Sequence, residues 1–203
     1  MAAADAPPLY GLILAGGRSS RMGRDKALLA YHGKPQIEWT AERARLVCER
    51  VYLSVRGDQA GDPARAQLPQ IVDRVTDKGP IAGIMAAQAH APDAAWLALA
   101  CDLPFIDEDT LRHLVAARDP ARVATAYRST HDGLPEPLCA IFEPKSRALI
   151  EAYVASGKDC PRKFLIRSDA LLIDQPHPRA LDNINTADEF RAASAELAGK
   201  RAS

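Results

Sequence analysis

Short apolar runs alternate along the chain with segments in which apolar residues recur at the spacing of a helix. After Pro35 the apolar residues fall on one helical face: Ile37, Ala41, Ala44 and Cys48. Further helices are expected at 82–90, from 107 to before 119, at 146–156 and from 186 onward. Strands are expected at 9–14, 51–55, 70–73, 94–101, 123–127, 138–142 and 171–174.

This alternation of strands and helices predicts an α/β fold, a Rossmann-like and mostly parallel mixed sheet flanked by helices. Because no internal repeat or linker interrupts the pattern, residues 1–203 are expected to form one domain. In such sheets ligands bind beyond the carboxyl ends of the strands. The loops after Leu14, Val55, Val72 and Cys101 are therefore the places to look for chemistry.

Composition removes several classes of function. The 26 Lys and Arg residues balance the 26 Asp and Glu residues, so a strong basic field for nucleic acid is not expected. The four cysteines form no CxxC pair, and their spacing in a chain of this size makes a disulfide framework improbable. The apolar run at 9–15 is too short to span a membrane or to direct export, so we expect a cytoplasmic protein without a membrane or nucleic-acid partner.

The loop that follows the first strand carries the strongest chemical signal. It contains three glycines and, between Arg18 and Lys26, four cations. Glycines let backbone N–H groups approach an anion, and cations neutralise phosphates. The loop has neither the Gly-Lys-Ser/Thr of a Walker A motif nor the G-x-G-x-x-G of a dinucleotide site. A phosphate-binding loop of another kind is predicted.

Two aspartates follow predicted strands. Asp102 ends the most apolar run of the chain, where a carboxylate is well placed to hold Mg²⁺ against phosphate oxygens. Asp73 also ends a short strand. For Asp102 the competing interpretation is a helix N-cap or a loop carboxylate with a backbone bond, and for Asp73 a purely structural role competes more strongly. Thr186 to Glu189 matches a capping box, so the preceding Asn183-Ile-Asn185 could serve the helix start alone or also the site.

Four motifs, in order, resemble those of the nucleotidyltransferases related to molybdenum cofactor guanylyltransferase. The first loop, Leu14-Ala-Gly-Gly through Arg21-Met-Gly-Arg-Asp-Lys26, resembles that family's L-A-G-G-x-x-x-R-M-G-x-D-K. Gly79 to Gly83 is similar to G-P-L-A-G, Cys101-Asp102 to C-D-x-P, and 183–189 to N-x-N-T-P-E-[DE], with Ala187 in place of the proline. The resemblance spans residues 9–189.

The resemblance implies a fold like that of the nucleotide-diphospho-sugar transferases and Mg²⁺-dependent transfer of GMP from GTP to the phosphate of the molybdopterin cofactor, with release of pyrophosphate. Residues 9–106 would bind the nucleotide and 107–190 the acceptor. Arg21 and Lys26 would neutralise phosphates, and Asp102 would ligate the metal. The other nucleotide-site positions implied are Leu14, Ala15, Gly16, Gly17, Ser54, Asp73, Gly79, Gly83 and Asn185. Transient contact with proteins that deliver or receive the cofactor is a further implication.

Several alternatives stay open. The Leu-Ala-Gly-Gly loop favours guanine, whereas Ser54 stands where the guanylyltransferases have a contacting Asn, so a CTP-using relative or another phosphorylated acceptor is the alternative. Glu136 is either an acceptor contact or a turn carboxylate, and the basic segment 157–163 is either a phosphate cradle or a surface loop. A dinucleotide-binding oxidoreductase lacks its fingerprint here, and a non-catalytic nucleotide sensor is disfavoured because Lys26 and Asp102 are both present.

Overall fold

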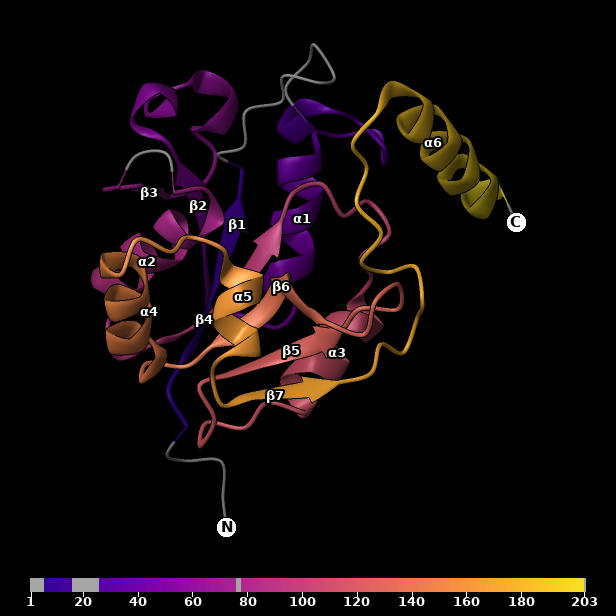
Figure 1. Cartoon of the computed structure of the whole chain (residues 1–203). Helices are drawn as coiled ribbons and strands as arrows, with labels where there is room; N and C mark the ends of the chain where they lie inside the picture. The colour runs from indigo at the N-terminus through magenta and orange to yellow at the C-terminus, as the bar shows by residue number, and fades with distance from the viewer. Residues whose placement is uncertain (1–5, 16–25, 76–77, 203) are drawn as a thin grey trace.

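The computed structural model describes residues 6–15, 26–75 and 78–202, and these form a seven-stranded sheet with the order β3-β2-β1-β4-β6-β5-β7 (Figure 1). The strands are β1 (Leu9–Leu14), β2 (Arg50–Val55), β3 (Gln70–Val72), β4 (Ala95–Ala100), β5 (Ala124–Arg128), β6 (Pro135–Phe142) and β7 (Ala170–Ile173). Strands β3, β2, β1 and β4 run parallel, β6 runs antiparallel to both β4 and β5, and β7 is parallel to β5. The prediction of a mostly parallel mixed sheet is confirmed.

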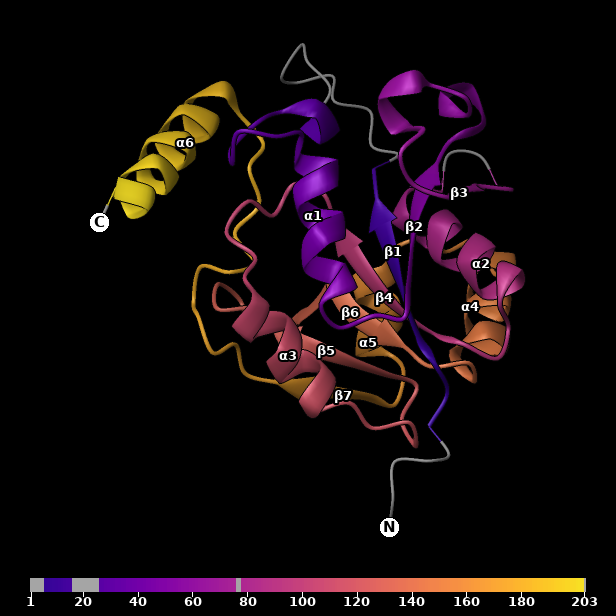
Figure 2. The same ribbon diagram turned by 180° about the vertical axis from the view of Figure 1, so that it is seen from behind.

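Helices cover both faces of the sheet. They are α1 (Gln36–Arg45), α2 (Pro80–His90), α3 (Glu108–Ala116), α4 (Ser146–Ala155), α5 (Pro161–Ile166) and α6 (Ala187–Ala202), with short 3₁₀ turns η2 (Lys26–Leu28), η3 (Gly57–Gln59) and η4 (Pro63–Arg65). Helices α2, α4 and α5 lie in front of the sheet in Figure 1, whereas α1 and α3 come to the front in Figure 2. Helix α6 projects from the carboxyl end of the parallel strands. None of these helices combines the length and apolar character that crossing a membrane requires.

The sheet divides the hydrophobic core into two layers because successive side chains of a strand point to opposite faces. In β4 all six residues are buried; Leu97 and Leu99 pack on the α1 and α3 side, and Trp96 and Ala98 on the side of α2 and α4. A central strand covered on both faces is expected to read as a continuous apolar run. The pattern of this strand was therefore visible in the sequence.

Two predicted loops are regular structure instead. Residues 161–163 of the basic segment belong to α5, which Pro161 opens as its first residue. Residues 135–137, expected in a polar loop, are the first part of β6, so Glu136 is a strand residue and the interpretation as a turn carboxylate is wrong. The β5–β6 ladder shifts register between Ala126 and Tyr127, a β-bulge that no local sequence signal announces.

The predicted capping box at the start of α6 is confirmed. The Thr186 hydroxyl accepts from the Glu189 N–H at 3.2 Å. The Glu189 carboxylate accepts from the N–H groups of Thr186 at 3.0 Å and Asn185 at 2.7 Å. This arrangement fixes the direction in which the chain enters α6 and holds the backbone of Asn185.

Candidate nucleotidyltransferase site

Four of the predicted nucleotide-site residues meet at the carboxyl ends of β1, β2 and β3. Leu14, the last residue of β1, is paired with Ser54 of β2, and the Ser54 hydroxyl donates to the Asp73 carboxylate at 2.9 Å. Asp73 continues the line of β3, because its N–H donates to the Val55 carbonyl at 2.9 Å. A methyl group placed on Gly83 of α2 would lie 2.4 Å from the Ser54 hydroxyl oxygen and 3.1 Å from Leu14. Only glycine allows α2 to approach the strands this closely.

Asp73 is half-buried, and its electrostatic environment is mixed. Burial raises the pKa of its carboxyl above the ordinary value, while the Ser54 hydrogen bond and the nearby Arg56 charge lower it. Arg56 follows β2 directly, and its guanidinium is paired with Asp58 at 2.9 Å. Arg56 was not among the predicted site residues. Its position as a cation directly after a predicted parallel strand could have marked it as a candidate.

Gly79 begins α2 in a conformation that few other residues adopt. Its φ is +61°, in the left-handed region, and Pro80 follows as the first helical residue. The free N–H groups at this end of α2 carry the positive end of the helix dipole. The predicted Gly79-to-Gly83 element thus combines a glycine turn with a close approach of Gly83 to Ser54 and Leu14.

Asp102 follows β4, next to β1 in the sheet. The strand pair continues past β4, since the Cys101 N–H donates to the Leu14 carbonyl at 3.3 Å. On its other side the Asp102 carbonyl accepts from the Ile184 N–H at 3.1 Å, which brings the predicted Asn185 element to Asp102. Burial raises the pKa of the Tyr31 hydroxyl, and the charge of Asp102 raises it further. The two motifs that lie about eighty positions apart in the sequence therefore meet.

The remaining predicted residues are less fully described. Ala15 is buried directly after β1. Gly16, Gly17 and Arg21 lie outside the described residues, as does the side chain of Lys26, whose backbone opens η2. Within the described ranges no group of three or more His, Cys, Asp or Glu side chains is arranged to hold a metal ion.

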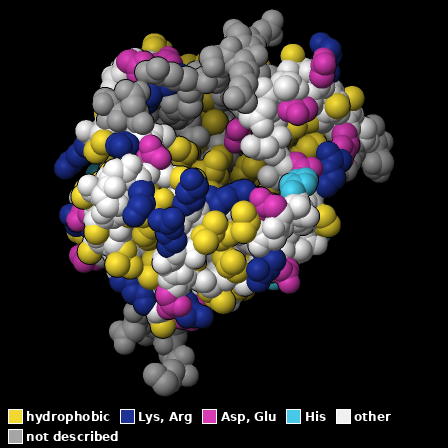
Figure 3. Space-filling view, in the orientation of Figure 1, with side chains coloured by type: hydrophobic (Ala, Val, Ile, Leu, Met, Phe, Trp, Pro, Cys, Tyr) yellow, Lys and Arg dark blue, Asp and Glu magenta, His cyan; other side chains and the backbone are white. Residues whose placement is uncertain are grey.

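A cleft of about 470 Å³ opens beside Asp102 on the side away from β1. It lies between β6, α5 and α6, and the face drawn in Figure 3 is hollowed near its centre, with acidic and basic side chains gathered around the hollow. Its apolar lining includes Leu103, Phe105, Leu138, Cys139, Leu181 and Ile184. Its charged lining includes Asp102, Asp132, Glu136, Arg162, Arg179, Asp182, Glu189 and Glu196.

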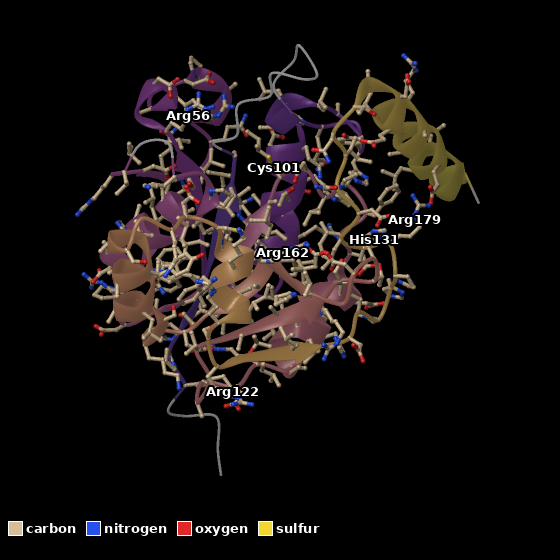
Figure 4. All side chains as sticks on the ribbon, viewed as in Figure 1. Arg56, Cys101, Arg122, His131, Arg162 and Arg179 are labelled. Carbon is tan, nitrogen blue, oxygen red and sulfur yellow. The ribbon has the colours of Figure 1, made fainter. Side chains whose placement is uncertain are left out.

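Two arginines organise this cleft. Arg162 of α5 donates to Asp132 and to Glu136, both at 2.9 Å, and its side chain remains 33% exposed. Arg179 donates to Asp182 at 3.1 Å and to Glu196 of α6 at 2.8 Å, and its guanidinium lies 4.6 Å from the centre of the Phe105 ring. In Figure 4 Arg162 and Arg179 lie on the cleft side of the molecule, whereas Arg122 lies at the lower edge of the view.

Of the three cations in the basic segment, Arg162 faces the cleft. Lys158 lies with its Nζ 5.6 Å from the centre of the Tyr153 ring, and neither Lys158 nor Lys163 lines the cleft. Because α5 starts at Pro161, Arg162 is placed by a helix and not by a loop. The sequence singles out the segment 157–163 but not Arg162 within it, and no pattern in the sequence marks Arg179 as a cleft residue.

Comparison with known proteins identifies relatives of this chain. Residues 11–171 match the family model of the MobA-like NTP transferase domain. The chain is 37% identical over 183 residues to a molybdenum cofactor biosynthesis bifunctional protein of Synechocystis; the match covers 90% of this chain and 53% of that protein, so this chain spans about half its length. It is 34% identical over 212 residues to the molybdenum cofactor guanylyltransferase of Rhizobium johnstonii, covering 98% and 97% of the two chains.

Among solved structures, the crystal structure of molybdopterin-guanine dinucleotide biosynthesis protein A from Archaeoglobus fulgidus superposes with a TM-score of 0.76 at 25% identity. That match covers 94% of this chain and 99% of the other. The family match, the sequence identity over nearly the whole chain and the structural superposition point to the same family. The chain belongs to the MobA-like NTP transferase family, a family of nucleotidyltransferases.

Proposed function

We propose that this enzyme transfers GMP from GTP to the phosphate of the molybdopterin cofactor, forming the guanine dinucleotide cofactor and pyrophosphate. The observation that carries the proposal is the position of Asp102. It stands between the cluster of Leu14, Ser54 and Asp73 on one side and the cleft on the other. A group at this position can contact both substrates. The relative that matches over nearly its whole length bears the name of this activity.

In this proposal the two halves of one domain divide the work. Residues 9–106 bind the nucleotide, and 107–190 bind the acceptor. Leu14, Ala15, Gly16 and Gly17 contact the nucleotide through their backbone, Arg21 and Lys26 neutralise its phosphates, and Gly79 and Gly83 let α2 approach it. Asp73 has the chemistry to accept hydrogen bonds from the adjacent N–H donors of a guanine edge, because a carboxylate accepts at two oxygens. Asn185 reaches the metal region from the other side.

MobA-like nucleotidyltransferases generally use a divalent metal, and we propose Mg²⁺ held by Asp102. The residues fit this ion, because Mg²⁺ usually keeps several waters and binds through one or two carboxylates together with substrate phosphates. When bound, the ion neutralises charge on the transferred phosphoryl group and on the departing pyrophosphate. A closed cage of protein ligands is not needed for this role.

The protein's own contribution is positioning and charge cover. The acceptor phosphate has a second pKa near ~6 and is mostly dianionic at neutral pH, so it needs no general base. Its oxygen attacks the α-phosphorus of GTP, the bond to the β-phosphate oxygen breaks, and that oxygen leaves with pyrophosphate. Arg21 and Lys26 stabilise the charge that develops. Holding both substrates at Asp102 supplies the favourable orientation.

On the acceptor side, Arg162 is the proposed contact for the anionic acceptor. Three features of its environment support this: Arg162 faces the cleft, it is partly exposed, and it uses two of its five N–H donors on Asp132 and Glu136. The apolar lining offers a surface for a ring system. We further propose a cytoplasmic location and transient contact with the proteins that deliver or receive the cofactor, with no nucleic-acid or membrane partner.

Thermal unfolding with GTP, CTP, ATP and NAD, each with and without Mg²⁺, tests the proposal. A ligand at a hundred times its Kd stabilises the folded state by about 2.7 kcal/mol. We expect the largest increase in Tm for GTP with Mg²⁺, and a smaller increase in the Asp102→Ala variant. A larger shift for CTP would support the cytidylyltransferase alternative that Ser54 leaves open. Stabilisation by NAD alone, or by no nucleotide, would contradict the proposal.

A further inference from the structure

Ser54 stands where the guanylyltransferases that this chain resembles have a contacting Asn. The surroundings of the Ser54 side chain leave it little access to a nucleobase. Ser54 is only 2% exposed. Its hydroxyl hydrogen is committed to the Asp73 Oδ1 at 2.9 Å. Gly83 covers it from α2, because even a methyl group there would meet the Ser54 oxygen at 2.4 Å. A side chain enclosed in this way has little surface to offer a ligand.

We infer that Ser54 is a positioning residue, which fixes the Asp73 carboxylate for nucleobase binding and does not itself contact the base. This inference rests on the proposed function. The Ser54 hydroxyl takes one acceptor position on Oδ1, which leaves Oδ2 and the second lone pair of Oδ1 of Asp73 to accept from the base. Gly83 completes the arrangement, since its missing side chain makes the space in which the Ser54 hydroxyl sits.

The register of the sheet explains why position 54 can do this. Ser54 is paired with Leu14 on one side and with Ile71 on the other, so it stands between the first loop and the end of β3. Asp73 is two residues beyond Ile71 and is held by its N–H to the Val55 carbonyl. The backbone thus fixes where Asp73 leaves the sheet, and the Ser54 hydrogen bond fixes how its carboxylate is turned.

A double-mutant cycle with Ser54→Ala, Asp73→Ala and the double variant tests the inference. GTP dissociation constants would be measured by calorimetry, and kcat by pyrophosphate release. Ser54→Ala alone should raise the GTP Kd roughly tenfold, the size expected for loss of one hydrogen bond to a charged group, while kcat at saturating GTP changes little. In the Asp73→Ala background, removing the Ser54 hydroxyl should have no further effect on Kd, because the group through which it acts is gone.

Ser146→Ala is the matched control. Ser146 is fully buried on α4 and accepts from Gln88 at 2.6 Å on the α2–α4 side of the sheet, so its loss reports the cost of removing any buried hydroxyl. It should leave GTP binding unchanged. Additive effects of Ser54→Ala and Asp73→Ala on Kd, or unchanged GTP binding in Ser54→Ala, would overturn the inference while leaving the proposed function intact. Failure of the wild-type enzyme to bind GTP would overturn both.

Discussion

The proposed nucleotide side (residues 9–106) and the proposed acceptor side (residues 107–190) of this molecule are held together by different kinds of contact. On the nucleotide side, parallel strands end together, and small residues allow a helix to approach them: Ser54 and Gly83 are in contact. On the acceptor side, long side chains bridge separate segments, as Arg162 does between α5 and β6 and Arg179 between the 179–182 turn and α6. Close packing of strands and helix fixes the positions of the side chains on the nucleotide side. On the acceptor side, an arginine that is paired with a protein carboxylate can exchange that carboxylate for a ligand anion.

Removing the group between the two sides should have the largest effect. Asp102→Ala is expected to lower kcat by on the order of 10²–10³-fold, because charge stabilisation at the transferred phosphoryl group is lost. Pyrophosphate release at saturating GTP and Mg²⁺ would measure it, and circular dichroism would verify the fold. Asp109→Ala, an exposed carboxylate in the first turn of α3, is the control. Near-normal turnover in Asp102→Ala would contradict the metal assignment.

Substitution of Arg162 should affect the acceptor side alone. We expect Arg162→Ala to raise the acceptor KM by about 10- to 100-fold, as loss of charge-assisted hydrogen bonds worth roughly 1.5–3 kcal/mol implies, with the GTP KM unchanged. Steady-state kinetics in both substrates would separate the two constants. Arg122→Ala removes an arginine that is paired with Asp169 far from the cleft and should leave both unchanged. An equal rise in the GTP KM would break the division into two sides.

Adding one carbon to α2 should affect the nucleotide side alone. Gly83→Ala forces a methyl group against the Ser54 hydroxyl, so we expect a loss of about 1–3 kcal/mol in the free energy of unfolding, together with weaker GTP binding. Gly57→Ala is the matched control, because a methyl group there meets nothing within 4 Å. Chemical denaturation and calorimetry would measure the two effects. A change in acceptor KM without a change in GTP binding would contradict the expected placement.

Lowering the pH should have the smallest effect on stability and GTP binding through Asp73. Burial raises the pKa of Asp73 above 3.8, while Ser54 and Arg56 oppose the rise. Since the folded state then holds this proton more tightly than the unfolded chain, the contribution of Asp73 to stability falls as pH rises through the interval from 3.8 to the raised value. GTP binding needs the ionised form and should weaken as pH falls through the same interval. Both slopes should be smaller in Asp73→Ala, and unchanged slopes would assign them to another group.

The sequence was informative where the determinants are local. The apolar run before Asp102, the glycines at 79 and 83 and the Thr186–Glu189 capping box are each contained within a few residues, and the structure has the strand, the turn and the cap that they predict. The nature of the first loop as a phosphate-binding loop stays a prediction. So do the roles of the site residues, for which the structure gives positions and contacts.

What could not be predicted depends on contacts between distant segments. The pairing of Ser54 with Asp73 requires the parallel register of β2 and β3, and that of Arg162 with Glu136 requires α5 to pack on β6. The short α5 gave no helical period long enough to recognise, and Pro135 and Pro137 made a strand there look like a loop. Prolines and short elements made the acceptor side hard to predict from the sequence, whereas continuous apolar strands made the nucleotide side predictable.

The hydrogen bond from the Ile184 N–H to the Asp102 carbonyl joins residues that are synthesised at different times. At roughly 5–20 residues per second, Ile184 is added about 4–16 s after Asp102. The four parallel strands are complete by Ala100, but the residues that close the far side of Asp102 and form the wall at Arg179 and α6 follow later. On the ribosome, the strands that carry the nucleotide side therefore exist before the acceptor cleft can form.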